Sequence, residues 1–98
     1  MINLEHLRTK GIVIDAIRPG DFETEVRRRL QYHFRSGAKL VWTTVPTLQE
    51  VKICRRDGSE EYLRAPATLS GEDVLPGFVL SVEDLLSAVD PQGAANSD

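Results

Sequence analysis

A run of β-branched residues near the start of the chain constrains the fold most. Ile12–Ile17 reads Ile-Val-Ile-Asp-Ala-Ile, an almost unbroken apolar segment that is typical of a strand covered on both faces. A Pro-Gly pair ends it, Asp21 is a good helix N-cap, and Gly37 closes the helix that we expect to follow. Lys39–Thr44 is the next expected strand. A strand, a helix and a strand joined by short links form a βαβ unit with parallel strands.

The helix expected after Asp21 is amphipathic. Its apolar side chains recur every four residues and form one stripe: Phe22, Val26, Leu30 and Phe34. Its other faces carry consecutive arginines, Arg27, Arg28 and Arg29. The pattern predicts a helix that packs on a sheet through the stripe and presents a basic outer side.

The second half of the chain predicts shorter elements. Glu50–Arg55 alternates apolar and polar residues, and an Asp-Gly turn leads into a returning strand, which together indicate a β-hairpin. We expect a bend at Thr68–Gly71 and a short apolar run at Phe78–Leu80. Ser81, followed three residues later by Asp84, opens a short final helix. The expected class is α/β (α+β): a mixed sheet with a βαβ unit, a C-terminal hairpin and a short final helix.

A chain of 98 residues has room for one domain. We expect a short segment at 1–11, the domain at 12–89 and a disordered tail at 90–98. Cys54 is the only cysteine, so an internal disulfide is excluded and a reducing, cytoplasmic setting is the default expectation. The sequence shows no signal peptide or membrane span, and no pattern for a small-molecule cofactor.

Charge is unevenly distributed along the chain. Residues 27–56 carry eight basic side chains and the single acid Glu50, whereas residues 57–98 carry nine acids and the single base Arg64. The basic middle predicts either a phosphate-facing surface or attraction between two halves of the domain. The isoelectric point near 5.3 favours the second interpretation, because dedicated nucleic-acid binders are usually basic overall.

Several strings resemble one known family. DVLPGF stands at 73–78 after a hairpin with an Asp-Gly turn, and SGAKLVW stands at 36–42 after the expected helix. In this order, and with IVIDAIRPGD at 12–21, they resemble the Uma-two type family of putative restriction endonucleases, a branch of the PD-(D/E)XK nuclease superfamily. The resemblance covers about residues 12–89. It implies a restriction-endonuclease-like mixed sheet flanked by helices and metal-dependent hydrolysis of DNA phosphodiesters.

The resemblance implies an incomplete site. Asp15 stands where the family has a metal-binding Glu, and Mg²⁺ is the expected cation if the chain is active. Ile17 stands where a Lys is usual, and Arg29 stands near a position from which some members draw a Lys. Arginine cannot act as a proton-transferring base, although it can stabilise charge. The family's other metal-binding Asp lies upstream, and here only eleven residues precede Ile12, so we expect an amino-terminally shortened domain.

Three hypotheses stay open, and with them whether the chain is an enzyme. The first is an endonuclease-like domain that is inactive as a lone chain. The second is a non-catalytic module that forms a homodimer through an exposed edge of the Ile12–Ile17 strand. The third is a nuclease that shares its site across a dimer.

The candidate residues also have structural interpretations. Asp15 would bind the metal and Arg29 would act beside it. Alternatively, Asp15 would be a strand-end acid that pairs with Arg18 or Lys39, or that faces water because a covering strand is missing. Arginines near the helix would bind DNA phosphates in the functional case, and would form a solvated helix face otherwise; these are Arg27, Arg28 and Arg35.

Overall fold

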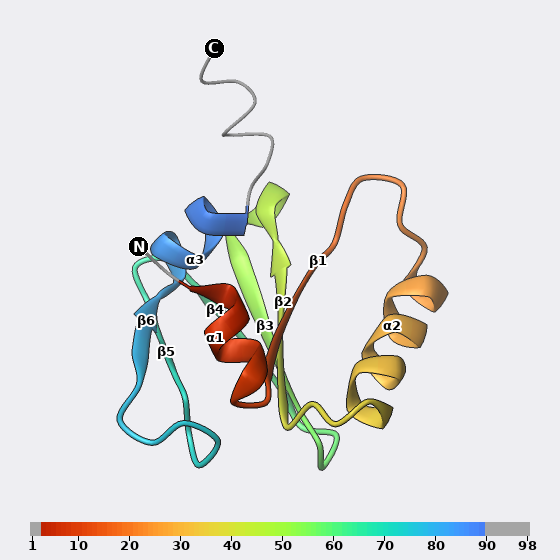
Figure 1. Cartoon of the computed structure of the whole chain (residues 1–98). Helices are drawn as coiled ribbons and strands as arrows, with labels where there is room; N and C mark the ends of the chain where they lie inside the picture. Colours follow the sequence, from red (N-terminus) through yellow and green to blue (C-terminus); the bar gives the residue numbers. More distant parts are fainter. Residues whose placement is uncertain (1–2, 90–98) are drawn as a thin grey trace.

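The predicted βαβ unit is present in the structure, a computed structural model that describes residues 3–89 (Figure 1). It consists of β1 (Ile12–Ala16), α2 (Glu23–Arg35) and β2 (Leu40–Val45). The two strands are parallel, with Ile12 opposite Leu40 and Ala16 opposite Thr44. This unit brings the end of β1 and the middle of α2 together, which is where the candidate residues lie.

The predicted hairpin extends this sheet. A 3₁₀ turn (Pro46–Leu48) reverses the chain, and β3 (Glu50–Arg55) pairs antiparallel with both β2 and β4 (Glu60–Arg64). The strand order of the four-stranded sheet is β1-β2-β3-β4, with one parallel and two antiparallel neighbours. The mixed sheet and the fold class expected from the sequence are therefore confirmed.

A second, two-stranded sheet replaces a predicted bend. β5 (Thr68–Ser70) pairs antiparallel with β6 (Val79–Ser81), so the expectation of a bend at 68–71 was wrong for most of that segment. Leu69 lies opposite Leu80, and both side chains are buried in the core. A strand of three residues is too short for apolar alternation to identify, so the tertiary contact of Leu69 determines it.

Two short helices have the capping residues that the sequence supplies. In α1 (Leu4–Thr9), the Asn3 side chain accepts a hydrogen bond from the His6 N–H at 3.1 Å. At the start of α3 (Val82–Val89), the Ser81 hydroxyl accepts one from the Asp84 N–H at 3.0 Å, as predicted. Each cap satisfies an N–H group that the first helical turn would otherwise leave unpaired.

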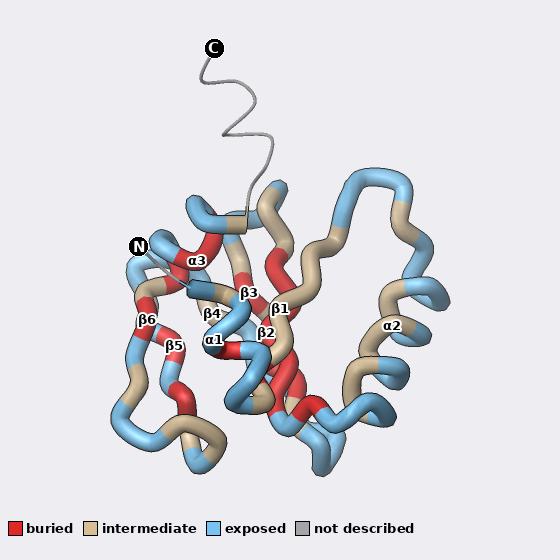
Figure 2. Tube along the Cα trace, in the orientation of Figure 1, coloured by how far each residue is buried: buried red, intermediate tan, exposed pale blue. Residues whose placement is uncertain are grey.

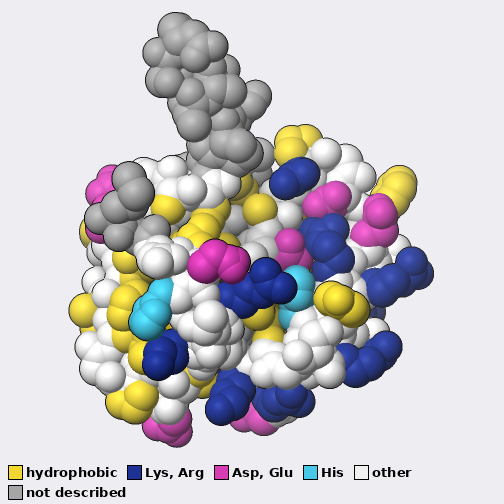
Figure 3. Space-filling model, in the orientation of Figure 1, with side chains coloured by type: hydrophobic (Ala, Val, Ile, Leu, Met, Phe, Trp, Pro, Cys, Tyr) yellow, Lys and Arg dark blue, Asp and Glu magenta, His cyan; other side chains and the backbone are white. Residues whose placement is uncertain are grey.

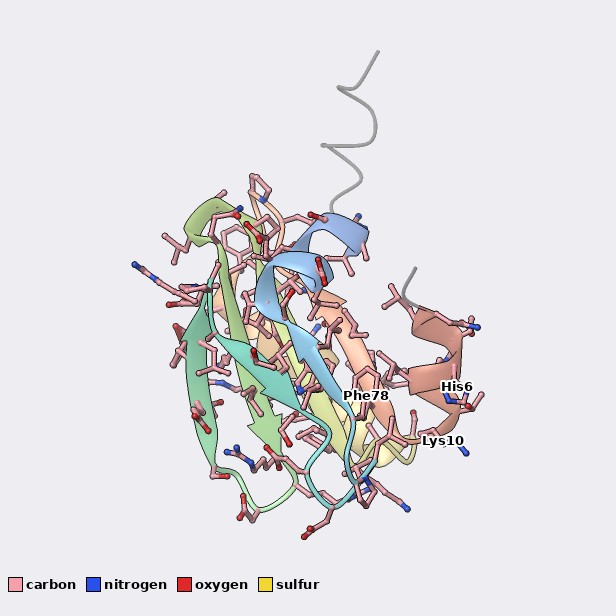
Figure 4. All side chains as sticks on the ribbon, turned by 90° about the vertical axis from the view of Figure 1, so that its left-hand side faces the viewer. His6, Lys10 and Phe78 are labelled. Carbon is pink, nitrogen blue, oxygen red and sulfur yellow. The ribbon has the colours of Figure 1, made fainter. Side chains whose placement is uncertain are left out.

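The four-stranded sheet is covered differently on its two faces. α1, α3 and the β5-β6 sheet lie over one face, and α2 lies over the other (Figure 1). The larger core is on the first face, where the buried Trp42 ring stacks on Phe78 with centroids 6.4 Å apart. Figure 4 shows Phe78 on the side of the sheet where α1 carries His6 and is followed by Lys10. Leu7 of α1 joins this core, so the N-terminal helix packs with the sheet.

The packing beneath α2 is thinner than the sequence predicts. No residue of α2 is fully buried, and Phe22, expected in its apolar stripe, is 71% exposed. Leu30 and Phe34 pack against a small cluster of Ala38, Val41 and Cys54. Phe22 precedes the first helical turn, and α2 packs mainly against β2, which explains why the stripe is only partly covered.

β1 is an edge strand of the described sheet. Ile12 is buried, but the rest of β1 is only half-buried, so the expectation of a strand covered on both faces was wrong beyond its first residue (Figure 2). The alternation explains the pattern: Ile12 and Ile14 face the larger core, and Val13 faces α2. An edge strand lacks one lateral neighbour, which leaves its side chains partly accessible.

Two further expectations concern the limits of the chain. The tail expected at 90–98 lies outside the described residues. None of the helices between residues 3 and 89 is both long and apolar enough to cross a membrane.

The buried contact of β5 gives a stability prediction. We expect Leu69→Ala to lower the free energy of unfolding by about 2–5 kcal/mol, because it removes a fully buried side chain from the core. Val79→Ala, in the paired strand, is the matched control, because Val79 is 65% exposed and its loss should cost less than about 0.5 kcal/mol. Urea unfolding checks both, and equal effects would contradict the assignment of Leu69 to the core.

Candidate functional site

The candidate site is an ion-pair cluster centred on Arg29. From α2, its Nε donates to Asp15 Oδ2 at 3.0 Å. Its Nη2 donates to Asp21 Oδ2 at 3.1 Å and to the Ala16 carbonyl oxygen at 3.3 Å. The guanidinium therefore joins β1, the loop after β1 and α2 at one point.

Helical spacing brings a second side chain of α2 to the same acid. His33 follows Arg29 by four residues, so both lie on the face of α2 that is turned to β1. The His33 Nε2 is 3.5 Å from Asp15 Oδ2. The Asp15 side chain is only 17% exposed, so its charge is held in a partly desolvated setting by these two neighbours.

The electrostatics of the cluster favour its charged form. The hydrogen bond from Arg29 to Asp15 is the main reason that the pKa of Arg29 is raised above its ordinary value. The pKa of Asp21 is lowered, chiefly because its carboxylate accepts a hydrogen bond from the Arg18 backbone N–H, with Arg29 adding to the effect. Both shifts keep the Arg29–Asp21 pair ionised near neutral pH.

The Asp15 carboxylate also lies against the open side of β1. Its Oδ1 accepts a hydrogen bond from the Ala16 N–H at 2.8 Å. Gly11 and Ile17 direct their backbone groups to the β2 side, since the Gly11 carbonyl accepts from Leu40 and the Ile17 N–H donates to Thr44. Alternation then directs the Ala16 amide away from β2, so Asp15 Oδ1 is on the free edge of the sheet.

A groove of about 470 Å³ follows this edge between α1 and α2. Val13 and Ile14 of β1 line it together with Ser36, which follows α2, and with residues of both helices: Leu4, Glu5, Arg8, Tyr32 and His33. Figure 3 shows basic side chains over the α2 side of this face, with acids and a histidine where that side meets β1. The groove thus combines an apolar floor with charged walls.

The described residues do not fit a complete magnesium site. Within residues 3–89, no three His, Cys, Asp or Glu side chains are grouped so that they could hold a metal ion. Asp15 and Asp21 are the nearby carboxylates, and the Arg29 guanidinium lies between them. A divalent cation usually needs more oxygen ligands than this and no competing positive charge.

The structure brings together some of the predicted site residues and separates others. Asp15 and Arg29 are in direct contact, as a shared site requires. Arg27 forms an ion pair with Glu23 at 3.1 Å on the outer side of α2. Arg28 and Arg35 are exposed there, and neither forms an ion pair with another residue of the described range.

Two expectations about the acids were wrong. Asp15 pairs with Arg29, and neither Arg18 nor Lys39 is its partner. Asp21 is not the N-cap of α2: that position is Phe22, whose N–H donates to the Glu25 carboxylate at 3.3 Å. The Asp21 carboxylate instead bonds the Arg18 N–H and Arg29, because the loop turns it back toward β1.

The sequence did not place Asp21 or His33 in one cluster with Asp15. The i, i+4 spacing of Arg29 and His33 was the available signal, since it places both on one face of the helix. Nothing local indicates that this face meets Asp15, because the orientation of α2 on the sheet is a tertiary property.

Comparison with solved structures finds a nuclease-type protein of similar fold. A crystal structure described as a "putative nuclease belonging to DUF820", from Anabaena variabilis, matches with a TM-score of 0.64 and 23% sequence identity. The two proteins share a fold over the matched residues. The match covers 79% of this chain but only 44% of that protein, so the chain spans less than half of its structural relative. No family model matches the sequence, and no curated protein does.

Removing the central guanidinium should destabilise the domain. We expect Arg29→Ala to lower the free energy of unfolding by about 1–3 kcal/mol, because it leaves the half-buried Asp15 without its charged donor. Arg28→Ala is the matched control on the same helix, and an exposed side chain without an ion pair should cost less than about 0.5 kcal/mol. Equal urea midpoints for the two variants would show that Arg29 does not hold α2 on β1.

Proposed function

We propose that the chain is a nuclease-type domain that contacts the DNA backbone and contributes Asp15 to a phosphodiester-hydrolysing site, and that a single copy is catalytically incomplete. The observation that carries the proposal is the position of Asp15 within a nuclease-like fold: a half-buried carboxylate on the free edge of β1, held by Arg29. The membership in the Uma-two type family suggested by the sequence strings is part of this proposal.

The chemistry that a lone copy lacks can be stated from its residues. The metal-dependent hydrolysis that the resemblance implies uses a cation bound by carboxylates and a group that moves a proton. Asp15 and Asp21 are both engaged by Arg29, and Arg29 remains protonated at any physiological pH. Ile17, which follows β1, provides no ionisable side chain. Arg29 can therefore stabilise phosphate charge but cannot replace the missing base. We propose that cleavage depends on Mg²⁺ only in a site to which another chain adds the missing groups.

The DNA-contacting surface would be the outer side of α2. Arg28 and Arg35 are exposed on it, and Arg27 lies beside them in a surface ion pair with Glu23. Exposed arginines bind backbone phosphates without reading sequence, and a surface ion pair is weak enough to exchange for a phosphate. The surface therefore fits a contact that positions the duplex without selecting a sequence.

This proposal predicts binding without cleavage. At a concentration where the chain is monomeric, we expect it to retard a supercoiled plasmid in a low-salt gel and to leave it un-nicked with Mg²⁺ or Mn²⁺. The double variant Arg28→Glu with Arg35→Glu should weaken retardation by at least tenfold, because it replaces phosphate contacts by repulsion.

Asp15→Asn is the matched control for cleavage, because it keeps the shape of the side chain and removes the charge. Nicking by the wild-type monomer that disappears in Asp15→Asn would show that one copy holds a complete site. Retardation unchanged by both arginine substitutions would remove α2 as the DNA surface.

A second candidate function is a non-catalytic module that forms a homodimer through β1. The contrast between the two edge strands of the described sheet favours it. β4 carries Glu60, Glu61 and Arg64, the type of charged side chains that protect an edge from pairing, whereas β1 has Asp15 as its only charged residue.

The second candidate is tested by light scattering at high micromolar concentration. A mass of two chains, together with absence of any plasmid retardation at low salt, would favour the module over the nuclease-type domain. A monomer throughout the concentration range would contradict it.

A further inference from the structure

The free edge of β1 has two backbone positions available for pairing. The backbone groups of Gly11 and Ile17 bond to β2, and along a strand every second residue directs its N–H and C=O to the same side. The even-numbered residues between them therefore direct their backbone groups to the open side, which includes the amides of Ile12 and Ile14. The next amide on that side, Ala16, already donates to Asp15 Oδ1. An added strand can therefore pair with Ile12 and Ile14 without displacing an existing hydrogen bond.

A lysine lies close to the start of this edge. Gly11 precedes β1, and a Cβ built on it would be 3.3–3.4 Å from the Cβ, Cγ and Cδ atoms of Lys39. The aliphatic stem of Lys39 thus lies across the position where any other residue would have a side chain. Lys39 is exposed and forms no ion pair with the rest of residues 3–89.

We propose that a second copy of this chain pairs antiparallel with β1, with Ile12 opposite Ile14 of the second copy, so that Lys39 of each copy lies beside Asp15 of the other. The inference rests on the proposed function and deepens it by naming what adds to the site. In this register Val13 lies on the twofold axis, and both amides that each copy has available are used.

The register places opposite charges together. With Ile12 opposite Ile14, Gly11 of one copy lies opposite Asp15 of the other, as a non-hydrogen-bonded pair with Cα atoms about 4.5 Å apart. Asp15 is on the face of the sheet that α2 covers, because it alternates with Ile14, which faces the larger core; Lys39 directly precedes β2, and its stem lies against Gly11. Because Gly11 has no side chain, the stem of Lys39 can pass over it toward the carboxylate of the other copy.

The neighbouring register is less favourable. If Ile14 faced Ile14 of the second copy, Ala16 would have to give up its hydrogen bond to Asp15, and Asp15 would lie opposite the apolar Val13. A carboxylate that lies opposite an apolar side chain loses hydrating water and gains no hydrogen bond or opposite charge in return. The groove walls suit self-association, since Glu5 and Arg8 offer both signs of charge and Tyr32 is 64% exposed at the rim.

The consequence for the site is specific. Within residues 3–89, the ion-pair partners of Asp15 are Arg29 and His33, and neither is a lysine. In the proposed dimer, Lys39 of the second copy provides an ammonium group there. A site with a carboxylate from one copy and a lysine from the other would be incomplete in the monomer.

Cysteine cross-linking tests the register directly. We expect Val13→Cys to form a disulfide-linked dimer in mild oxidant, because a non-hydrogen-bonded antiparallel pair has a Cα separation suited to a disulfide. Ile14→Cys is the matched control: in this register, the two copies of residue 14 are diagonal neighbours about 7–8 Å apart, too far for an unstrained bond. The native Cys54 is 2% exposed, and burial raises its thiol pKa, so it should not compete.

The outcomes separate the possibilities. A dimer with Val13→Cys and none with Ile14→Cys supports the proposal. The reverse pattern, equal cross-linking of both, or no cross-linking at any protein concentration up to high micromolar overturns it. Circular dichroism of the reduced variants confirms that each is folded before oxidation.

Charge reversal tests the lysine. We expect Lys39→Glu to raise the dimer dissociation constant at least tenfold at low salt and Lys39→Arg to change it less than threefold. Arg64→Glu, on β4 at the opposite edge of the sheet, is the control for net charge. Equal effects of Lys39→Glu and Arg64→Glu would remove Lys39 from the interface. If the Val13→Cys variant forms the cross-linked dimer but does not retard plasmid, the pairing through β1 is supported and the proposed function is contradicted. If the chain retards plasmid but never cross-links, the proposed function is supported and the pairing is contradicted.

Discussion

The hydrogen bonds of Arg29 to three oxygens hold α2 on the face of the sheet that lies opposite the larger core. The apolar contacts of α2 are few, and none of its side chains is fully buried, so hydrophobic burial alone fixes the helix weakly. A guanidinium that bonds Asp15, Asp21 and the Ala16 carbonyl adds directional contacts from a rigid planar group. The position of α2 along β1 follows from that geometry.

The same contact sets the chemistry available to Asp15. One carboxylate oxygen is held by Arg29 and approached by His33, and the other bonds the Ala16 amide at the open edge. An acid arranged this way is neutralised from within the domain, which allows it to be half-buried without a metal ion. In a single copy, these structural contacts therefore engage both oxygens of the carboxylate that we propose for catalysis.

Much of the fold could be predicted because its signals are local. The apolar run at Ile12, the Asp-Gly turn and the Ser81 cap each depend on a few neighbouring residues. β5 and the partners of Asp15 could not be predicted, because they depend on which surfaces of the chain meet after folding. Asp21 shows the difference: by sequence it is a good N-cap, and the loop instead turns it to Arg29. The site was thus predicted as a pair of residues, and its geometry required the packing of α2.

Folding uses much of the basic charge of the middle segment. Arg55 bonds Glu61 and Glu72, and Lys52 pairs with Glu60, so the attraction between the basic middle and the acidic second part of the sequence is realised as contacts. The exposed charges that remain include Arg28 and Arg35 on α2 and Lys39 at the edge. A twofold axis perpendicular to the sheet keeps both α2 helices on the same face. Pairing through β1 would therefore join two basic helix surfaces into one, which makes self-association and backbone binding compatible in one molecule.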